Sequence, residues 1–248
     1  MGALHPKVAA WKREATEDPE GFWGRAAEQL PWFRKWERVL DWEPPTFRWY
    51  SGGLSNLAYN CVDHHVKTGA GARTALITES ERGEQRTYTY SQLHDEVKRV
   101  GAALRGLGIK KGDRIAIYMP TCAEAIALML GAVRIGAVII VIFAGFGAGA
   151  LGERIRLAGA RAVFATDVTY RKGKDVPLKQ IVDDAVAGAP TVERVIVLKR
   201  GTGAVAMTAG RDITWEDFLR GASGQDDTHV EMEANEPAYI LATSGTTA

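Results

Sequence analysis

Cysteine is scarce in this chain, and its scarcity excludes two kinds of small, cross-linked domain. Cys61 and Cys122 are the two cysteines among 248 residues, which is too few for a disulfide framework or a cysteine-rich metal cluster. Both lie in segments that we expect to be helical and apolar. We therefore predict two reduced, buried thiols and a cytoplasmic protein.

The chain also lacks an excess of charge of either sign. Lys and Arg total 31 and Asp and Glu total 30, so the net charge is +1. Proteins that bind nucleic acid or anionic membranes usually carry a surplus of Lys and Arg, so we expect neither partner. With 46% hydrophobic and 25% charged residues, the composition is that of a globular protein and excludes extensive disorder.

Long apolar segments are nearly absent. The N-terminal sequence MGALHPKVAAWK has no apolar core of the kind that a secretory signal needs. Residues 125–146 are apolar apart from Arg134 and have about the length of a membrane-spanning helix. Gly131 and Gly136 interrupt this run, and β-branched residues replace helix-favouring ones after Gly136. The pattern predicts a buried helix followed by a buried parallel strand.

Tryptophan is concentrated at the N-terminal end. Six of the seven tryptophans, and the pair Pro44-Pro45, lie in residues 1–70. We expect this segment to form short helices and turns pinned by aromatic side chains rather than a sheet. It would pack as a helical extension, residues 1–70, against a larger body made of residues 71–248.

Residues 71–248 alternate between strand and helix patterns. We expect strands at Thr74–Glu79, Gln85–Thr89, Arg114–Met119, Ala137–Phe143, Arg161–Thr166, Arg194–Leu198 and Ala238–Ala242. We expect helices at Tyr90–Leu107, Thr121–Arg134, Leu151–Ala158, Pro177–Ala187 and Thr214–Leu219, with Ser91 and Thr214 as N-caps. This order predicts an α/β fold with a mainly parallel sheet and helices on both of its faces.

A glycine-rich turn follows the strand that ends at Phe143. Gly145, Gly147 and Ala150 fit the pattern G-x-G-x-x-[GA], and Asp167 follows about twenty residues later, where a dinucleotide-binding fold keeps its ribose-binding acid. That pattern would suit an NAD-dependent oxidoreductase. The alternative is that small residues here let a tight turn and a helix pack closely.

A basic stretch follows the next strand. Tyr170-Arg171-Lys172-Gly173-Lys174 places three cations near the carboxyl end of a parallel strand, which is where ligands bind in open α/β sheets. Such a cluster can hold a phosphate. A solvated charged loop is the alternative.

The last residues have the composition of an anion-binding loop. Thr243, Ser244, Gly245, Thr246 and Thr247 follow an apolar strand, and their hydroxyl and backbone N–H groups could surround a triphosphate. The segment contains no lysine, so it is not a G-x-x-x-x-G-K-[ST] loop. A Ser/Thr-rich frayed end is the alternative.

Several segments, taken in order, resemble the AMP-forming acyl-CoA synthetases, which are adenylate-forming ligases, and in particular the acetyl-CoA synthetase branch. The segments that carry this resemblance are KGDRIAIYMP at residues 111–120, RIGA at 134–137, FAGF at 143–146, YRKGK at 170–174, GRDITW at 210–215 and ATSGTT at 242–247. The Trp-rich start is similar to the N-terminal extension of that branch. The resemblance covers nearly the whole chain.

The resemblance implies an acetate–CoA ligase that uses ATP with Mg²⁺ to adenylate a short-chain carboxylate and then forms a thioester with CoA. Thr243–Thr247 would hold the ATP phosphates. The positions that the family places around the CoA nucleotide are matched by Phe143, Gly145, Arg171 and Lys174. By this resemblance the Gly-rich turn is a surface near CoA and not an NAD site.

The resemblance also implies that parts of the enzyme lie beyond Ala248. The carboxylate pocket and a mobile C-terminal domain with its catalytic lysine would follow, so we expect no catalytic residue in this chain and no activity of the chain alone. Ile139, Ile140 and Gly147 stand where the family commonly has polar residues, and Ala248 stands where it usually has glycine. The alternatives are a propionate enzyme and a non-catalytic nucleotide- or CoA-binding remnant, with an NAD-dependent oxidoreductase as a remote third.

Overall fold

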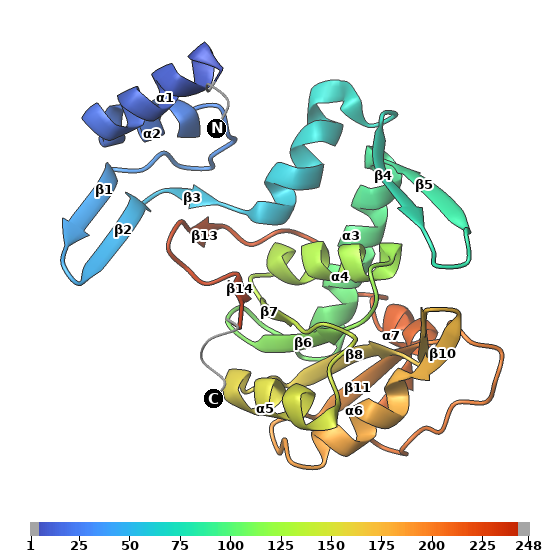
Figure 1. The fold of residues 1–248 in the computed structure, drawn as a ribbon. Helices are drawn as coiled ribbons and strands as arrows, with labels where there is room; N and C mark the ends of the chain where they lie inside the picture. The colour runs from blue at the N-terminus through green and yellow to red at the C-terminus, as the bar shows by residue number, and fades with distance from the viewer. Residues whose placement is uncertain (1–4, 243–248) are drawn as a thin grey trace. The chain divides into compact units, whose positions relative to one another are not determined.

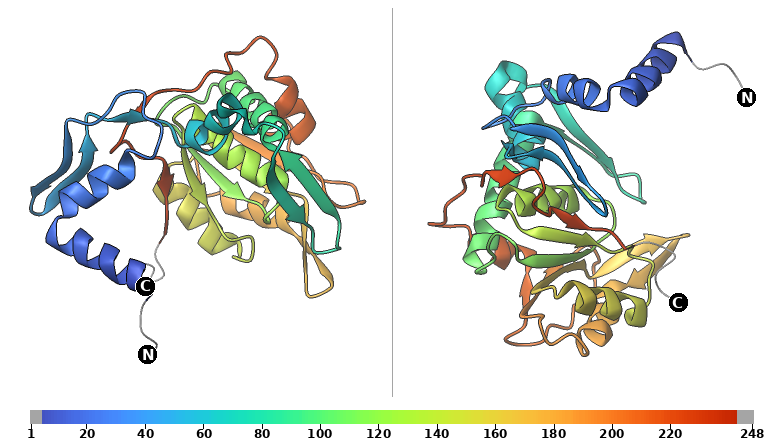
Figure 2. Two further views of the ribbon diagram at one scale, coloured as in Figure 1. Left: turned by 90° about the horizontal axis from the view of Figure 1, so that it is seen from above. Right: turned by 90° about the vertical axis from the view of Figure 1, so that its left-hand side faces the viewer.

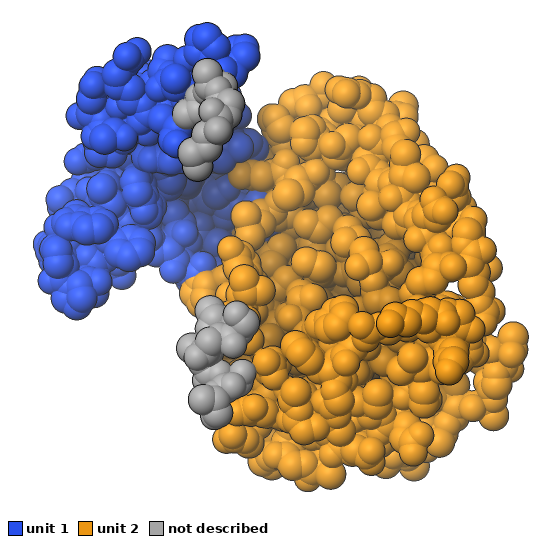
Figure 3. Space-filling view, in the orientation of Figure 1, with its two compact units in different colours: residues 1–56, 231–236 blue, residues 57–230, 237–248 orange. Residues whose placement is uncertain are grey.

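The computed structural model describes residues 5–242. By its internal contacts the chain divides into two compact units, which Figure 3 colours blue and orange. Unit 1 comprises Met1–Asn56 and Glu231–Glu236, and unit 2 comprises Leu57–Val230 and Pro237–Ala248. The division into domains after residue 70 stays a prediction.

Unit 1 contains helices and, against expectation, strands. The helices are α1 (Pro6–Glu17) and α2 (Pro19–Ala27), and the strands are β1 (Arg38–Glu43), β2 (Thr46–Ser51), β3 (Leu54–Ser55) and β13 (Met232–Glu233). β1 pairs antiparallel with β2, and β3 with β13. The prediction of turns without sheet was wrong because the prolines Pro44 and Pro45 connect two strands instead of breaking them. Trp42 and Phe47 lie opposite each other on these strands with ring centroids 5.8 Å apart, a cross-strand pair that stabilises a hairpin.

Unit 2 is built on a parallel sheet of six strands within the described residues (Figure 1). Its spatial order is β12-β11-β8-β6-β7-β14, and every neighbouring pair is parallel. The strands are β6 (Arg114–Tyr118), β7 (Val138–Val141), β8 (Ala162–Thr166), β11 (Arg194–Leu198), β12 (Asp212–Thr214) and β14 (Tyr239–Ile240). The chain runs from β6 outward to β7 and then returns past β6 to β8. This is the reversal of a doubly wound sheet, and it creates a switch point between β6 and β8.

Helices cover both faces of this sheet, which confirms the predicted fold class (Figures 1 and 2). One face carries α3 (Tyr90–Gly106), α4 (Ala123–Arg134) and α7 (Trp215–Arg220), and the other carries α5 (Ala148–Ala158) and α6 (Leu178–Val186). Successive strand residues serve opposite faces. Phe164 belongs to the first core and Val163 to the second, and both are fully buried.

Helix α3 follows an antiparallel hairpin formed by β4 (Thr74–Glu79) and β5 (Gln85–Thr89). Leu93, Val97, Val100 and Leu104 recur at the spacing of one helix face, and all four are buried. Its N-cap is Thr89, not Ser91, because Thr89 and Gln92 exchange side-chain-to-backbone hydrogen bonds of 3.2 and 2.8 Å in a capping box. Thr214 caps α7 as predicted, accepting a hydrogen bond of 3.0 Å from the N–H of Asp217.

The apolar run at residues 125–146 divides between α4 and β7, as predicted. Within the described part of the chain, no helix is long and apolar enough to cross a membrane. The prediction of two buried thiols holds for Cys122 and is wrong for Cys61, which is exposed. Cys61 lies in the one-turn helix η1 (Tyr59–Asp63), in which Val62 and Asp63 are buried and Cys61 is exposed.

Candidate functional site

The carboxyl ends of β6, β7 and β8 border a cavity of about 340 Å³ at the edge of the sheet. Three segments line this cavity. They are residues 119–121, which follow β6, residues 141–145, at the end of β7 and after it, and residues 169–171, shortly after β8. Glu81, from the turn between β4 and β5, completes the wall. The cavity therefore lies at the edge where open α/β sheets bind ligands, beside the switch point.

Three of the four residues predicted to contact CoA meet in this cavity. Phe143, Gly145 and Arg171 all line it. The Arg171 guanidinium carbon lies 5.7 Å from the centroid of the Phe143 ring, and Phe143 is 62% exposed. A Cβ atom at Gly145 would lie 2.4 Å from the Phe143 ring and 2.8 Å from Arg171 Nη1. The absence of a side chain at Gly145 is what lets the ring and the guanidinium occupy their places.

The basic stretch forms a hairpin and not the solvated charged loop that was the alternative. Strands β9 (Val168–Arg171) and β10 (Lys174–Pro177) pair antiparallel. Lys172 and Gly173 connect them with φ values of 50° and 75°, the double left-handed conformation of a type I′ turn. Arg171 and Lys174 are cross-strand partners, so both side chains project from the same face of the hairpin.

The positive charges of this hairpin are not neutralised. Arg171, Lys172 and Lys174 are exposed, and none of them forms an ion pair among the described residues. A guanidinium and an ammonium side by side, next to an exposed aromatic ring, can hold a phosphate-bearing nucleotide through charge-assisted hydrogen bonds and stacking.

The alternative interpretation of the Gly-rich turn as a dinucleotide site is not supported. Asp167, which would have to bind a ribose, is 6% exposed. Its carboxylate accepts hydrogen bonds from the backbone N–H groups of Val168, Arg200 and Gly201 at 2.8, 2.7 and 3.0 Å. The acid is thus used to join the segments that follow β8 and β11. Gly147 is the N-cap residue of α5, and it has open space around it.

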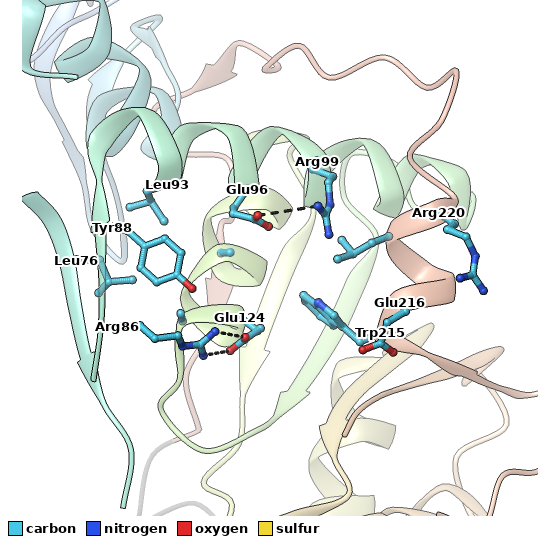
Figure 4. Close-up of a pocket in the computed structure, with 13 residues that line it drawn as sticks. Leu76, Arg86, Tyr88, Leu93, Glu96, Arg99, Glu124, Trp215, Glu216 and Arg220 are labelled. Atoms are coloured by element: carbon cyan, nitrogen blue, oxygen red, sulfur yellow. Dashed lines mark hydrogen bonds and ion pairs between the residues drawn. The ribbon is translucent and has the colours of Figure 1, made fainter. Parts of the chain in front are cut away.

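A larger cavity of about 590 Å³ lies between the β4–β5 hairpin and helices α3, α4 and α7 (Figure 4). Its charged groups largely compensate one another. Arg86 donates two hydrogen bonds, of 2.7 and 2.9 Å, to the carboxylate of Glu124, and Glu96 lies 4.0 Å from Arg99. None of the predicted site residues lines it. We therefore assign the candidate site to the smaller cavity, because it lies at the carboxyl edge of the sheet, and not to the larger one.

The phosphate loop predicted at Thr243–Thr247 lies outside the described residues. The strand before it, β14, pairs in parallel with β7. Tyr239 lies opposite Ile139, and Ile240 lies opposite Ile140. The carboxyl ends of β14 and β7 therefore lie at the same edge of the sheet. Ile139 and Ile140 are buried in the two cores and do not line the cavity.

Sequence reasoning missed Glu81 and Arg82, which lie in the turn between β4 and β5. Glu81 lines the cavity and accepts a hydrogen bond of 3.3 Å from Thr169 on β9, a residue 88 positions away. Arg82 contacts Asp175 on β10, which is 93 positions away. No local pattern links residues so far apart in sequence, so no signal in a single sequence could have found them.

Comparison with known proteins identifies the class of this chain. Residues 62–248 match the family described as "AMP-binding enzyme", and residues 8–61 match "Acetyl-coenzyme A synthetase N-terminus". The chain belongs to the AMP-binding enzyme family, which confirms the resemblance inferred from its motifs.

Three relatives show the degree of similarity. The acetyl-coenzyme A synthetase of Deinococcus radiodurans is 42% identical over 236 residues, which cover 95% of this chain and 36% of that protein. Those of Streptomyces avermitilis and Streptomyces coelicolor are 44% and 45% identical over 235 residues, which cover 94% of this chain and 36% of each relative. The chain thus spans little more than a third of the length of these relatives.

Proposed function

We propose that this chain forms the CoA-binding and ATP-phosphate-binding part of an AMP-forming acetate–CoA ligase. The observation that carries the proposal is the meeting of Phe143, Gly145 and Arg171 in one cavity at the carboxyl edge of the sheet, with Lys174 paired to Arg171. The similarity to acetyl-coenzyme A synthetases supports the choice of reaction. Acetate is preferred to propionate because the relatives carry that name.

The proposed reaction has two steps. A carboxylate oxygen of acetate attacks the α-phosphorus of ATP, and pyrophosphate leaves. The CoA thiol then attacks the carbonyl carbon of the acyl adenylate, its proton is lost, and AMP leaves. Thr243–Thr247 would bind the β- and γ-phosphates during the first step through hydroxyl and backbone N–H groups. The role of this chain is positioning and charge neutralisation, since we assign it no catalytic residue.

Mg²⁺ would enter with ATP and neutralise part of its phosphate charge. No group of three or more His, Cys, Asp and Glu side chains is arranged to hold a metal ion within residues 5–242. We assign no residue of this chain to the cation. From the similarity to acetyl-coenzyme A synthetases, we propose that the ligase acts on small molecules in the cytoplasm.

CoA would lie with its nucleotide half against the hairpin. Arg171 and Lys174 would hold its phosphates, and the adenine could stack on the exposed ring of Phe143, a kind of contact worth about 1–3 kcal/mol. Gly145 would keep the floor of the cavity open. The pantetheine arm would then extend from the cavity toward the remainder of the enzyme.

Calorimetric titration of the chain with CoA tests this site. We expect the Arg171→Ala and Lys174→Ala variants each to weaken CoA binding about tenfold, because each removes a charge-assisted contact. The matched control is Arg156→Ala, which removes an exposed arginine on α5 outside the cavity. An equal loss in all three variants would show that only net charge matters and would contradict the site.

Acetate-dependent exchange of pyrophosphate into ATP tests the assignment of catalysis to other parts of the enzyme. We expect no exchange with the purified 248-residue chain. Exchange above background would show that the chain contains a complete adenylation site, and our division of roles would then be wrong.

A further inference from the structure

The hairpin that carries Arg171 and Lys174 is too small to hold its own position. Each strand has four residues, and β9 and β10 pair only with each other among the described strands. An isolated two-stranded hairpin is marginally stable in water. The position of Arg171 and Lys174 therefore depends on contacts between the hairpin and the rest of unit 2.

The two faces of the hairpin carry different side chains. Directly opposite residues of an antiparallel pair share a face, and successive residues alternate. Arg171 and Lys174 are partners on one face, and Tyr170 and Asp175 are partners on the other. A contact to Tyr170 and Asp175 can therefore fix the hairpin without covering Arg171 and Lys174.

Arg82 makes that contact to both strands. Its guanidinium carbon lies 3.7 Å from the centroid of the Tyr170 ring on β9, and its Nη2 lies 3.3 Å from Asp175 Oδ1 on β10. The Arg82–Asp175 ion pair is exposed, with 54% and 62% of the side chains accessible, so it adds little to global stability. Its geometric effect is to join the two strands of the hairpin to the β4–β5 turn.

The turn that carries Arg82 is itself ordered. The N–H of Ser80 donates to the carbonyl of Glu84 at 2.8 Å, and Ser80 Oγ accepts from the N–H groups of Arg82 and Glu84 at 3.3 and 3.1 Å. Gly83 supplies the left-handed conformation, with φ of 81°. Arg82 thus projects from a closed turn rather than from a freely moving loop.

A second set of contacts holds the same ring in place. The Tyr170 hydroxyl donates to the carbonyl of Arg200 at 3.0 Å, and the Arg200 guanidinium lies 5.3 Å from the Tyr170 ring. Arg200 Nη2 is 3.0 Å from Glu81, the neighbour of Arg82 in the turn. Tyr170 is therefore held by two guanidinium groups from segments more than a hundred residues apart.

We propose that Arg82 is a positioning residue for CoA binding, which fixes Tyr170 and Asp175 and thereby sets where Arg171 and Lys174 present their charges. The proposal rests on the proposed function of those two cations. Arg82 does not line the cavity that holds Phe143, Gly145 and Arg171, so it acts through the hairpin and not by touching the nucleotide.

Two measurements on the 248-residue chain test the role of Arg82. We expect Arg82→Ala to raise the Kd for CoA about threefold to tenfold, and Arg82→Lys to recover part of the loss because an ammonium group can still lie over the Tyr170 ring. We also expect faster amide hydrogen exchange at residues 168–177 in Arg82→Ala, with unchanged exchange in β6 and β8. The Arg156→Ala control should change neither quantity.

The two measurements separate the failure of this proposal from the failure of the proposed function. If Arg171→Ala weakens CoA binding and Arg82→Ala does not, the CoA site stands and the positioning role is overturned. If Arg171→Ala has no effect on CoA binding, the proposed site itself is wrong. Unchanged exchange at residues 168–177 in Arg82→Ala overturns the positioning role whatever the affinities are.

Discussion

Arg134 donates a hydrogen bond of 2.7 Å to the carboxylate of Asp63, and the two side chains are only 3% and 5% exposed. This pair explains why a charged residue stands in the otherwise apolar run at residues 125–146. Arg134 ends helix α4, and Asp63 ends η1. The Arg134 Nε also donates to the carbonyl of Asp227 at 2.9 Å. One buried guanidinium therefore joins three segments that are distant in sequence.

Replacing Asp63 with alanine should destabilise unit 2 strongly. The substitution removes the buried carboxylate that Arg134 contacts at 2.7 Å, and the loss of one member of a buried pair costs about 3–5 kcal/mol of unfolding free energy. Urea denaturation followed by far-UV circular dichroism measures the loss. The control is Arg99→Ala, which breaks an exposed contact of 4.0 Å and should cost less than about 1 kcal/mol. Equal losses in the two variants would contradict a special role for the buried pair.

Gly145→Ala should impair CoA binding without unfolding the chain. The new Cβ would lie 2.4 Å from the Phe143 ring and 2.8 Å from Arg171 Nη1, so both groups must move. Both are exposed side chains that can move at little cost in stability, but the cavity they form changes shape. We expect the Kd for CoA to rise about tenfold, measured by calorimetry, with an unchanged urea midpoint.

Gly149→Ala is the matched control for that substitution. A Cβ at Gly149 meets nothing within 4 Å, and the residue lies in helix α5. Alanine there should be neutral or stabilising by up to about 1 kcal/mol, with normal CoA affinity. If Gly149→Ala weakens CoA binding as much as Gly145→Ala, the close approach at Gly145 is not the cause.

The parallel sheet could be predicted from sequence because its strands are buried on both faces. Such strands appear as short runs of β-branched and other apolar residues separated by amphipathic helices, and β6, β7, β8 and β11 follow that pattern. The hairpins β1–β2 and β9–β10 could not be predicted in the same way. In one the connection is Pro44-Pro45, and in the other a left-handed turn contains Lys172, a residue that rarely adopts positive φ.

Some residues of the candidate site could likewise be predicted from the sequence, and others could not. Phe143, Gly145 and Arg171 could be selected because their motifs resemble those of a family, and the fold brings them together. Glu81 and Arg82 could not, because their part in the site depends on contacts with Thr169 and Asp175 that only the folded chain creates. Motifs indicate what touches a ligand, whereas the residues that hold those motifs in place are set by tertiary packing.

The Arg86–Glu124 pair should make the stability of unit 2 depend on pH. Burial raises the pKa of Glu124, but the hydrogen bonds and charge of Arg86 outweigh it, so the pKa of Glu124 falls below its ordinary value. A carboxylate with a lowered pKa stabilises the fold fully above its unfolded pKa of about 4.3, and this contribution disappears as the pH falls through the folded pKa. The difference in urea midpoint between the wild-type chain and Glu124→Gln should therefore be large at pH 7 and shrink in acid. A difference that stays constant with pH would contradict the ion pair.

Lys179 and Asp212 form the core of a second buried charge cluster, and two substitutions there should have unequal effects. Lys179 Nζ lies 2.7 Å from Asp183 Oδ1 and 2.8 Å from Asp212 Oδ2, and the Asp212 side chain is fully buried. Arg211 also contacts Asp212, at 2.5 Å. These contacts connect α6 to the beginning of β12.

Asp212→Asn leaves Lys179 and Arg211 to share the partly exposed carboxylate of Asp183, whereas Lys179→Met leaves the fully buried Asp212 still paired with Arg211. Removing one member of a buried pair costs about 3–5 kcal/mol when the other charge is left uncompensated. Because Asp183 still faces both cations, we expect a loss below that range for Asp212→Asn, and a smaller one for Lys179→Met, whose apolar side chain fills a similar volume. Urea midpoints of the two variants at neutral pH measure the difference. A larger loss for Lys179→Met would mean that Lys179, and not Asp212, is the group on which the cluster depends.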